Sequence, residues 1–292
     1  MGKLIRGLSE NGGVVFCGVD STDIVRTAEK LHTTSATCSA ALGRLLTGAS
    51  LMGSMLKDDG DSITLRVSGG GPAGVVIACT DASGNVKGCI DHPLVELPAK
   101  ANGHLDVGGA VGKDGVLTVI RDNKLPKEPT VGQVPLISGE IAEDITCYYA
   151  YSEQVPSVCA LGVLVDKDLS ILCAGGYLLQ LLPGAPDEVI DKLEAGIQRA
   201  GAVTPMLEQG MTPEDILGQV CGDLGVVFLE TAEVSYKCYC SRERVTRALI
   251  SLGKEELTQI MEEGKPFPVE CQFCDAVYSF TPADIAGLLE KI

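Results

Sequence analysis

Two close pairs of cysteines near the end of the chain constrain its fold more than any other feature. The pairs are Cys238-x-Cys240 and Cys271-x-x-Cys274, and thirty residues separate them. Zinc takes four ligands in a tetrahedron, and thiolate is its favoured structural ligand. Two close pairs brought together by an intervening fold are the usual way to build such a site. We therefore expect a small C-terminal domain, residues 232–292, whose four cysteines bind one Zn²⁺.

The sequence around the pairs predicts the elements that bring them together. Two short helices are expected over Arg242–Leu252 and Lys254–Glu263. A hairpin formed by Val269–Cys271 and Ala276–Phe280 would hold the second pair in its turn. Thr281, followed by Pro282 and Asp284, has the features of a helix start, so a last helix is expected there.

A module of this size should depend on its metal. Structural zinc contributes about 10–16 kcal/mol to folding, whereas a whole domain is stable by only about 5–15 kcal/mol. Oxidising the thiols to disulfides would remove the ligands, so oxidation would unfold the module. Four basic residues surround the first pair: Lys237, Arg242, Arg244 and Arg247. Their positive charge would either lower the pKa of the thiols or only balance the negative charge of four thiolates.

The N-terminal part of the chain predicts a large α+β domain, residues 1–178. Two helices are expected, from Ser21 or Thr22 to Leu31 and from about Ser35 to Leu56, the second rich in small residues that allow close packing. Alternating and β-branched runs predict strands over Ile63–Val67, Val116–Arg121, Ile145–Tyr151, Cys159–Val165 and Leu169–Ala174. The stretch "GPAGVVIACTDASGNVKGCI" predicts a strand, a turn at Asp81–Asn85 and a second strand. Short strands joined by hairpin turns favour a largely antiparallel sheet.

A segment of different character, residues 179–231, is expected to be a helical, acidic linker. Between Gly176 and Ser235 the chain has ten acidic and two basic residues. Pro186–Ala200 starts with a proline and two acids and then places apolar residues on one face, as a helix does. Thr212 and Asp215 have the spacing of a capping box.

Charge and hydropathy exclude two kinds of partner. The formal net charge of −16 argues against nucleic acid, because binding there depends on Lys and Arg neutralising phosphates. The one long membrane-like stretch, Ala40–Leu56, is too short to span a bilayer and contains Arg44. The N-terminus has no apolar region of the kind a signal peptide needs, so a cytoplasmic protein is expected.

The eight remaining cysteines are expected to be small buried hydrophobes, namely Cys17, Cys38, Cys79, Cys89, Cys147, Cys159, Cys173 and Cys221.

The cysteine pattern resembles that of the redox-regulated thirty-three-kilodalton heat shock chaperonin family. The resemblance runs the whole length of the chain and includes three further segments, "TSATCSAALGRLLTGASLMGSMLK", "VPLISGEIAEDITCYYAYSEQVPS" and "AGGYLLQLLPGAP". It implies an ATP-independent holdase rather than an enzyme. In the reduced state the four cysteines would hold zinc and the protein would be inactive.

The resemblance also implies how such a protein is activated. Peroxide or hypochlorite would form Cys238–Cys240 and Cys271–Cys274 disulfides, zinc would leave, and the C-terminal domain and linker would unfold. The active homodimer would capture unfolding client proteins and later pass them to ATP-dependent chaperones. The linker supports this view because its apolar faces would be exposed if their cover were lost. The candidate client-binding residues are Met206, Leu207, Met211, Ile216, Leu217 and Val220.

Two alternatives belong to other functional classes. A thiol–disulfide oxidoreductase could use Cys271 and Cys274, but such enzymes usually place the pair at a helix N-terminus after a strand. A zinc-ribbon regulator would bind nucleic acid, which the net charge opposes. No motif in the chain indicates a hydrolase or nucleotide enzyme, and the three histidines lie far apart in sequence; they are His32, His92 and His104.

Overall fold

The computed structural model describes residues 1–123, 128–290 and 292. It separates into two compact units, Met1–Lys237 and Cys238–Ile292. The predicted boundaries at 178 and 232 lie inside strands of the first unit, and the division into three functional parts remains a prediction. None of the helices among the described residues is long and apolar enough to cross a membrane.

The first unit is built on two five-stranded antiparallel sheets. One sheet has the strand order β10-β1-β2-β9-β8, with β1 Gly2–Ser9, β2 Val14–Asp20, β8 Ser157–Val165, β9 Ile171–Leu181 and β10 Val226–Val234. The other has the order β5-β4-β3-β6-β7, with β3 Ser62–Ser68, β4 Val75–Asp81, β5 Val86–Ile90, β6 Val116–Asp122 and β7 Thr130–Pro135. The predicted α+β class with antiparallel pairing is confirmed.

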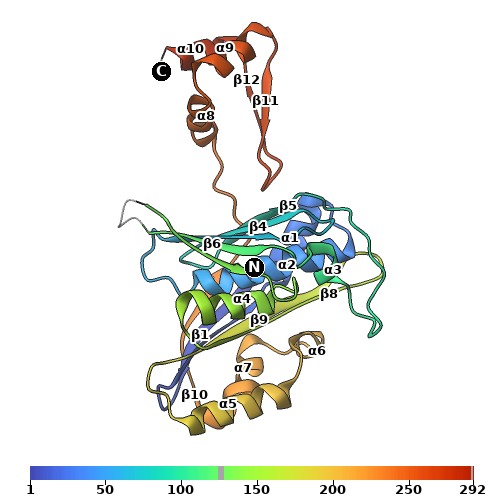
Figure 1. Ribbon diagram of the computed structural model, residues 1–292, viewed down its shortest axis with the longest axis vertical. Helices are drawn as coiled ribbons and strands as arrows, with labels where there is room; N and C mark the ends of the chain where they lie inside the picture. The colour runs from blue at the N-terminus through green and yellow to red at the C-terminus, as the bar shows by residue number, and fades with distance from the viewer. Residues whose placement is uncertain (124–127, 291) are drawn as a thin grey trace. The chain divides into compact units, whose positions relative to one another are not determined.

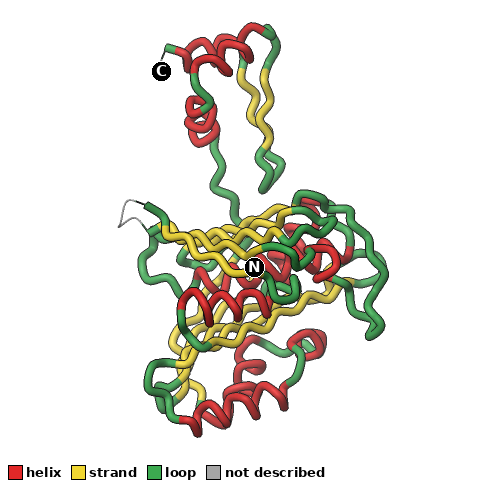
Figure 2. Tube along the Cα trace, in the orientation of Figure 1, coloured by secondary structure: helices red, strands yellow, loops and turns green. Residues whose placement is uncertain are grey.

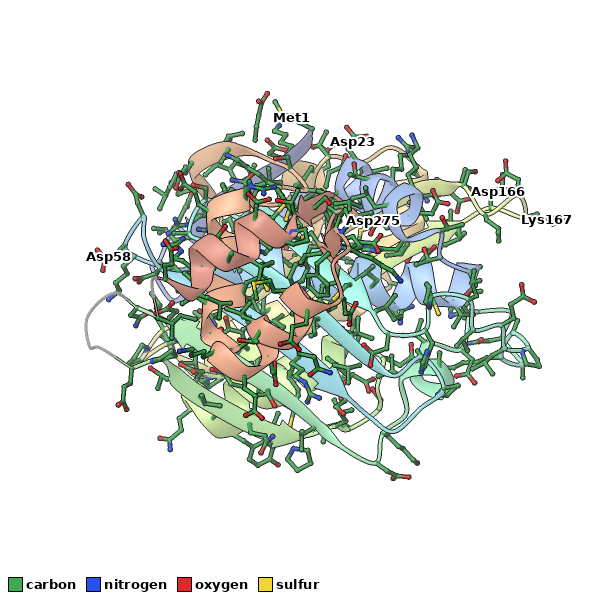
Figure 3. The ribbon with its side chains drawn as sticks, turned by 90° about the horizontal axis from the view of Figure 1, so that it is seen from above. Met1, Asp23, Asp58, Asp166, Lys167 and Asp275 are labelled. Atoms are coloured by element: carbon green, nitrogen blue, oxygen red, sulfur yellow. The ribbon has the colours of Figure 1, made fainter. Side chains whose placement is uncertain are left out.

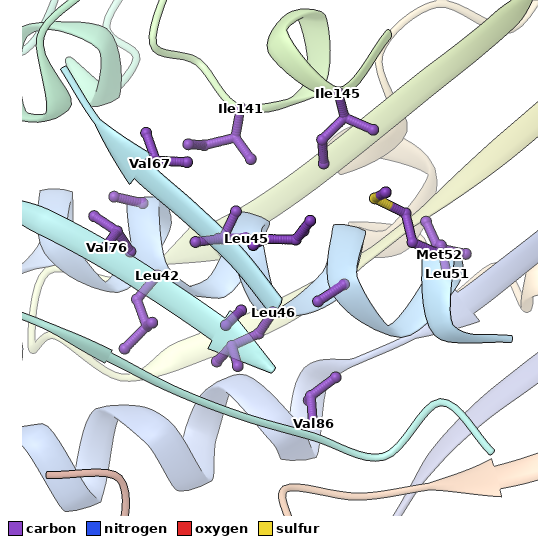
Figure 4. Packing of buried hydrophobic residues seen from close by; sticks show 14 of the residues in the cluster. Leu42, Leu45, Leu46, Leu51, Met52, Val67, Val76, Val86, Ile141 and Ile145 are labelled. Atoms are coloured by element: carbon purple, nitrogen blue, oxygen red, sulfur yellow. The ribbon is translucent and has the colours of Figure 1, made fainter. Parts of the chain in front are cut away.

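The helix α2, Ala36–Gly53, lies between the two sheets, beside α1, Thr22–His32 (Figure 1). Every α2 residue from Thr37 onward is buried except Arg44. The small residues permit this packing, because a Cβ on Gly43 would lie 2.7 Å from Val25 Cγ1. The helix α2 packs against strands of both sheets. Its leucines lie in one core cluster with Val67, Val76 and Val86 of the second sheet (Figure 4).

The segment Ile145–Tyr151 was predicted to be a strand, and this prediction is wrong. It forms the end of α4, Ala142–Tyr148, and the start of a π-helix, Tyr149–Glu153. The carboxylate of Asp144 caps the start of the helix, since it accepts the N–H groups of Ile137 at 2.7 Å and Ile141 at 2.9 Å. Ile145, Tyr148 and Tyr149 are all buried, at the i, i+3, i+4 spacing of one helix face. Before α4 lies one further short helix, α3, Val107–Val111.

Three helices cover the outer face of the first sheet: α5 Asp187–Ala200, α6 Val203–Glu208 and α7 Pro213–Cys221 (Figure 1). The predicted capping box is present, with Asp215 N–H donating to Thr212 Oγ1 at 3.2 Å. A short 3₁₀-helix, Gly222–Leu224, follows. The expectation that residues 179–231 are helical is wrong for the last part of this range. Gly225 adopts φ +69°, and the residues from Val226 onward form strand β10, which pairs antiparallel with β1.

The second unit consists of helices and one β-hairpin (Figure 2). Its elements are α8 Arg242–Ser251, α9 Lys254–Glu262, β11 Phe267–Glu270, β12 Val277–Phe280 and α10 Pro282–Leu289. The predicted start of α10 is confirmed, since Asp284 N–H donates to Thr281 Oγ1 at 3.2 Å. Its buried apolar residues form one cluster, namely Leu249, Leu257, Phe280, Ile285 and Leu288.

At the other end of the chain, the first strand is fixed to α1 by an ion pair. The Met1 ammonium group lies 2.6 Å from Asp23 Oδ2 (Figure 3). Both side chains are more than half exposed, so the pair should add little to stability.

Candidate metal centre

The four clustered cysteines come from two segments of the second unit. Cys238 and Cys240 lie in the extended stretch before α8, and Cys271 and Cys274 lie in the turn between β11 and β12. Backbone hydrogen bonds shape that turn: Cys271 N–H donates to Ala276 O at 3.0 Å and Cys274 N–H to Cys271 O at 3.1 Å. None of these bonds uses a sulfur atom, so the turn holds the second pair in place through its backbone.

The sulfur atoms form one compact cluster. All four Sγ atoms lie within 4.8 Å of one another. Across the two segments, Cys238 Sγ is 3.7 Å from Cys271 Sγ, and Cys240 Sγ is 3.3 Å from Cys274 Sγ. A tetrahedral site with Zn–S bonds of about 2.3 Å separates its sulfurs by about 3.8 Å. The cluster could therefore hold one metal ion, and its all-thiolate donor set suits zinc.

The thiols differ in their acidity. The Tyr278 hydroxyl donates a hydrogen bond to Cys240 Sγ at 3.1 Å, and this bond lowers the pKa of Cys240 to about 7. Burial raises the pKa of Cys238, and it raises the pKa of Cys274 to about 12. Neighbouring sulfurs cannot all carry a negative charge without a counter-charge. A divalent cation would supply that charge, and its binding would release protons.

The basic residues near the first pair do not explain the acidity of Cys240, since the Tyr278 hydrogen bond is its first cause. Arg242 instead ties α8 to the end of the hairpin. Its guanidinium donates to Ser279 O at 2.8 Å and to Asp284 Oδ2 at 3.1 Å, and it lies 4.3 Å from the centre of the Phe280 ring. Sequence reasoning missed Tyr278, although its place four residues after Cys274 in the returning strand is the signal that could have found it.

The candidate client-binding residues lie in the first unit, on α6, on α7 and in the loop between them. Five of them are buried in one cluster against the outer face of the first sheet: Met206, Leu207, Ile216, Leu217 and Val220. Met211 is half-buried beside them. The cluster includes Phe16 and Tyr177 of the sheet, so these apolar faces are ordinary core in the state described.

The eight other cysteines do not join the cluster. Six are buried and two, Cys79 and Cys173, are half-buried. Burial raises the pKa of Cys17 and of Cys221 to about 12. Such thiols are weak nucleophiles, which fits the interpretation that they are packing residues.

The oxidoreductase alternative lacks its expected geometry. Cys271 and Cys274 lie in a hairpin turn between two short antiparallel strands. They do not occupy the N-terminus of a helix after a parallel strand, which is the usual context of a redox-active Cys-x-x-Cys pair.

Comparison with known proteins gives consistent matches along the chain. A family model described as Hsp33 protein matches residues 2–281. The 33 kDa chaperonin of Lachnoclostridium phytofermentans is 45% identical over 288 residues, covering 99% of this chain and 98% of that protein. The 33 kDa chaperonin of Clostridium botulinum strain 657 is 44% identical over 289 residues, covering 99% and 97%. The crystal structure of the 33 kDa chaperonin (heat shock protein 33 homolog) from Thermotoga maritima superposes with a TM-score of 0.89 at 38% identity, covering 99% of this chain and 98% of that one.

Proposed function

The chain belongs to the Hsp33 family of chaperones, and from this we propose that it is an ATP-independent holdase activated by oxidation. The observation that carries the proposal is the cluster of four sulfur atoms within 4.8 Å. A chaperone of this kind needs no catalytic site. Its activity would come from apolar surface that is covered in one redox state and uncovered in the other.

In the reduced state, Cys238, Cys240, Cys271 and Cys274 would hold one Zn²⁺. The ion would supply a cross-link between the segment before α8 and the β11–β12 turn. The small core of the second unit, with five buried apolar residues, makes this cross-link important, because a core in a domain below about 70–80 residues rarely supplies more than about 3–5 kcal/mol. The protein would be inactive in this state.

Oxidation would remove the ligands. Two thiols lose two electrons and two protons as a disulfide forms, and one molecule of hydrogen peroxide becomes two molecules of water. A first disulfide between Cys271 and Cys274 and a second between Cys238 and Cys240 would use all four sulfurs. The second unit would then unfold, and the helices α5–α7 would loosen from the first sheet.

The uncovered surface would bind client proteins. The residues with this role would be Met206, Leu207, Met211, Ile216, Leu217 and Val220, together with the sheet residues under them. Methionine side chains are flexible and adapt to varied partners. We further expect the active form to be a homodimer in the cytoplasm and to pass its clients to ATP-dependent chaperones after reduction.

Three measurements on one sample test the proposal. Bound zinc, free thiols and suppression of thermal aggregation of an unfolding client are measured before and after peroxide at elevated temperature. We expect about one zinc and four thiols to be lost per chain as suppression appears. Release of zinc without any suppression of aggregation would refute the proposal.

A further inference from the structure

The chain leaves the first unit through a three-residue segment, Ser235–Lys237, that is bound along the edge of the second sheet. Val86 N–H donates to Ser235 O at 3.0 Å, and Lys237 N–H donates to Val86 O at 2.7 Å. Val86 and Tyr236 form a parallel bridge. Since β10 is an edge of the first sheet and β5 an edge of the second, this segment joins the edges of the two sheets immediately before Cys238.

Side chains strengthen the attachment. The backbone N–H and the hydroxyl of Ser235 both donate to Asn85 Oδ1 at 3.1 Å. The Tyr236 hydroxyl donates to Gly88 O at 2.8 Å and accepts from Gly88 N–H at 3.3 Å. His32 Nε2 lies 2.9 Å from the same carbonyl oxygen and 3.3 Å from the Tyr236 hydroxyl. We call the side chains of His32, Asn85, Ser235 and Tyr236, with the backbone of Val86 and Gly88, the clasp.

The strand before the clasp, β10, pairs with β1 along its length but buries few of its side chains. In β10, Val227, Phe228 and Leu229 are 38%, 42% and 65% exposed. Only the last residue of the strand, Val234, is fully buried, and it belongs to the main core. Strands with exposed side chains and one open edge have low local stability. The firm attachment of β10 at this end therefore lies at Val234 and the clasp.

We propose that the clasp is a stop that confines unfolding of the second unit to residues beyond Lys237. While the clasp holds, loss of structure around Cys238 does not reach β10. When it opens, β10 can separate from β1, and the neighbouring α7 loses a contact at the edge of the first sheet. The consequence for activation rests on the function proposed above: the strength of the clasp would set how readily unfolding of the second unit uncovers the α5–α7 layer.

Hydrogen exchange on the full-length, reduced protein tests the stop directly. Zinc is removed with a chelator under reducing conditions, so that the second unit opens without oxidation. In the parent protein we expect residues 238–290 to lose protection while Val226–Val234 keep theirs. The variant Tyr236→Phe removes both hydroxyl contacts with Gly88 and should speed exchange in Val226–Val234 by roughly tenfold.

Two further variants make the result specific. Tyr151→Phe removes the same atom from a side chain that is 77% exposed, and it should leave exchange in β10 unchanged. His32→Ala removes a donor to Gly88 and should act in the same direction as Tyr236→Phe. If Tyr236→Phe exchanges like the parent in β10, or if the parent already loses all protection there, the inference is wrong.

The same samples separate this inference from the proposed function. Aggregation of an unfolding client is followed after peroxide treatment. If β10 exchanges faster in Tyr236→Phe but no variant suppresses aggregation of the client, the inference about the clasp is supported and the chaperone mechanism is refuted. If all variants suppress aggregation equally after equal exposure to peroxide, and β10 exchange is unchanged in Tyr236→Phe, the chaperone mechanism stands and the inference about the clasp is refuted.

Discussion

The substitution Cys271→Ser tests the ligand assignment most directly. Serine keeps the size and the backbone of the residue, and the turn is held by backbone bonds such as Cys271 N–H to Ala276 O. The fold of the hairpin should therefore survive, and the change should act on the metal alone. Cys271 Sγ lies 3.7 Å from Cys238 Sγ of the other segment, which is the separation expected of two ligands of one zinc ion.

The size of the effect follows from the four-sulfur geometry. Structural zinc binds with about 10–16 kcal/mol, and four similar ligands share this as about 2.5–4 kcal/mol each. Losing one ligand should weaken zinc binding by about 100- to 1,000-fold, since about 1.4 kcal/mol is tenfold. The second unit should also melt at a lower temperature without any oxidant.

The assay is competition with a chromophoric chelator, combined with thermal unfolding of the zinc-loaded protein. Cys79→Ser is the matched control, because Cys79 is half-buried in β4 and takes no part in the cluster. Its zinc affinity should equal that of the parent. Unchanged zinc affinity and unchanged melting in Cys271→Ser would show that Cys271 is not a ligand.

Two further predictions concern pH. Zinc affinity should fall by at least about 100-fold for each pH unit below neutrality, because at least two thiols with raised pKa, Cys238 and Cys274, must release protons to bind the metal. Chelator competition between pH 6 and 8 measures this slope, and a change of about tenfold or less per pH unit would show that Cys238 and Cys274 are not both ligands. Glu140→Gln should destabilise the first unit by about 3 kcal/mol at pH 7, because it breaks a mostly buried pair with Arg44 at 2.5 Å. Burial acts to raise the pKa of Glu140, but the bonds from Lys100 and Arg44 outweigh it and hold the pKa below the usual value. That stability is present above the unfolded pKa and is lost as the pH falls through the folded one, so the difference in urea unfolding between parent and variant should shrink below about pH 4.

Local signals in the sequence located the elements of the second unit well. The helices α8 and α9, the β11–β12 hairpin and the start of α10 lie within a few residues of their predicted positions. Capping residues and close cysteine pairs act over only a few residues, so they can be recognised in a sequence. The same holds for α2, whose small residues predicted tight packing.

The strands of the first sheet illustrate what the sequence could not show. Neither β1 nor β10 was predicted, and they pair with each other across more than 200 residues, as in the register of Gly2 with Val234. Such pairing depends on long-range contacts, which no local pattern reports. Helix α4 was missed for a related reason, because the Asp144 carboxylate that starts it also binds N–H groups of the preceding loop. The clasp and Tyr278 depend on the same kind of contact.

Differences in metal binding and burial explain how oxidation could act on one unit of a chain with twelve cysteines. The thiolate is the form that oxidants attack. With a pKa of about 12, Cys17 and Cys221 are ionised in only about one molecule in 10⁵ at pH 7. Sulfurs bound to a metal are already thiolates, and all four clustered cysteines are partly exposed. We therefore expect oxidant to react with the four clustered cysteines before it reacts with buried thiols such as Cys17 and Cys221.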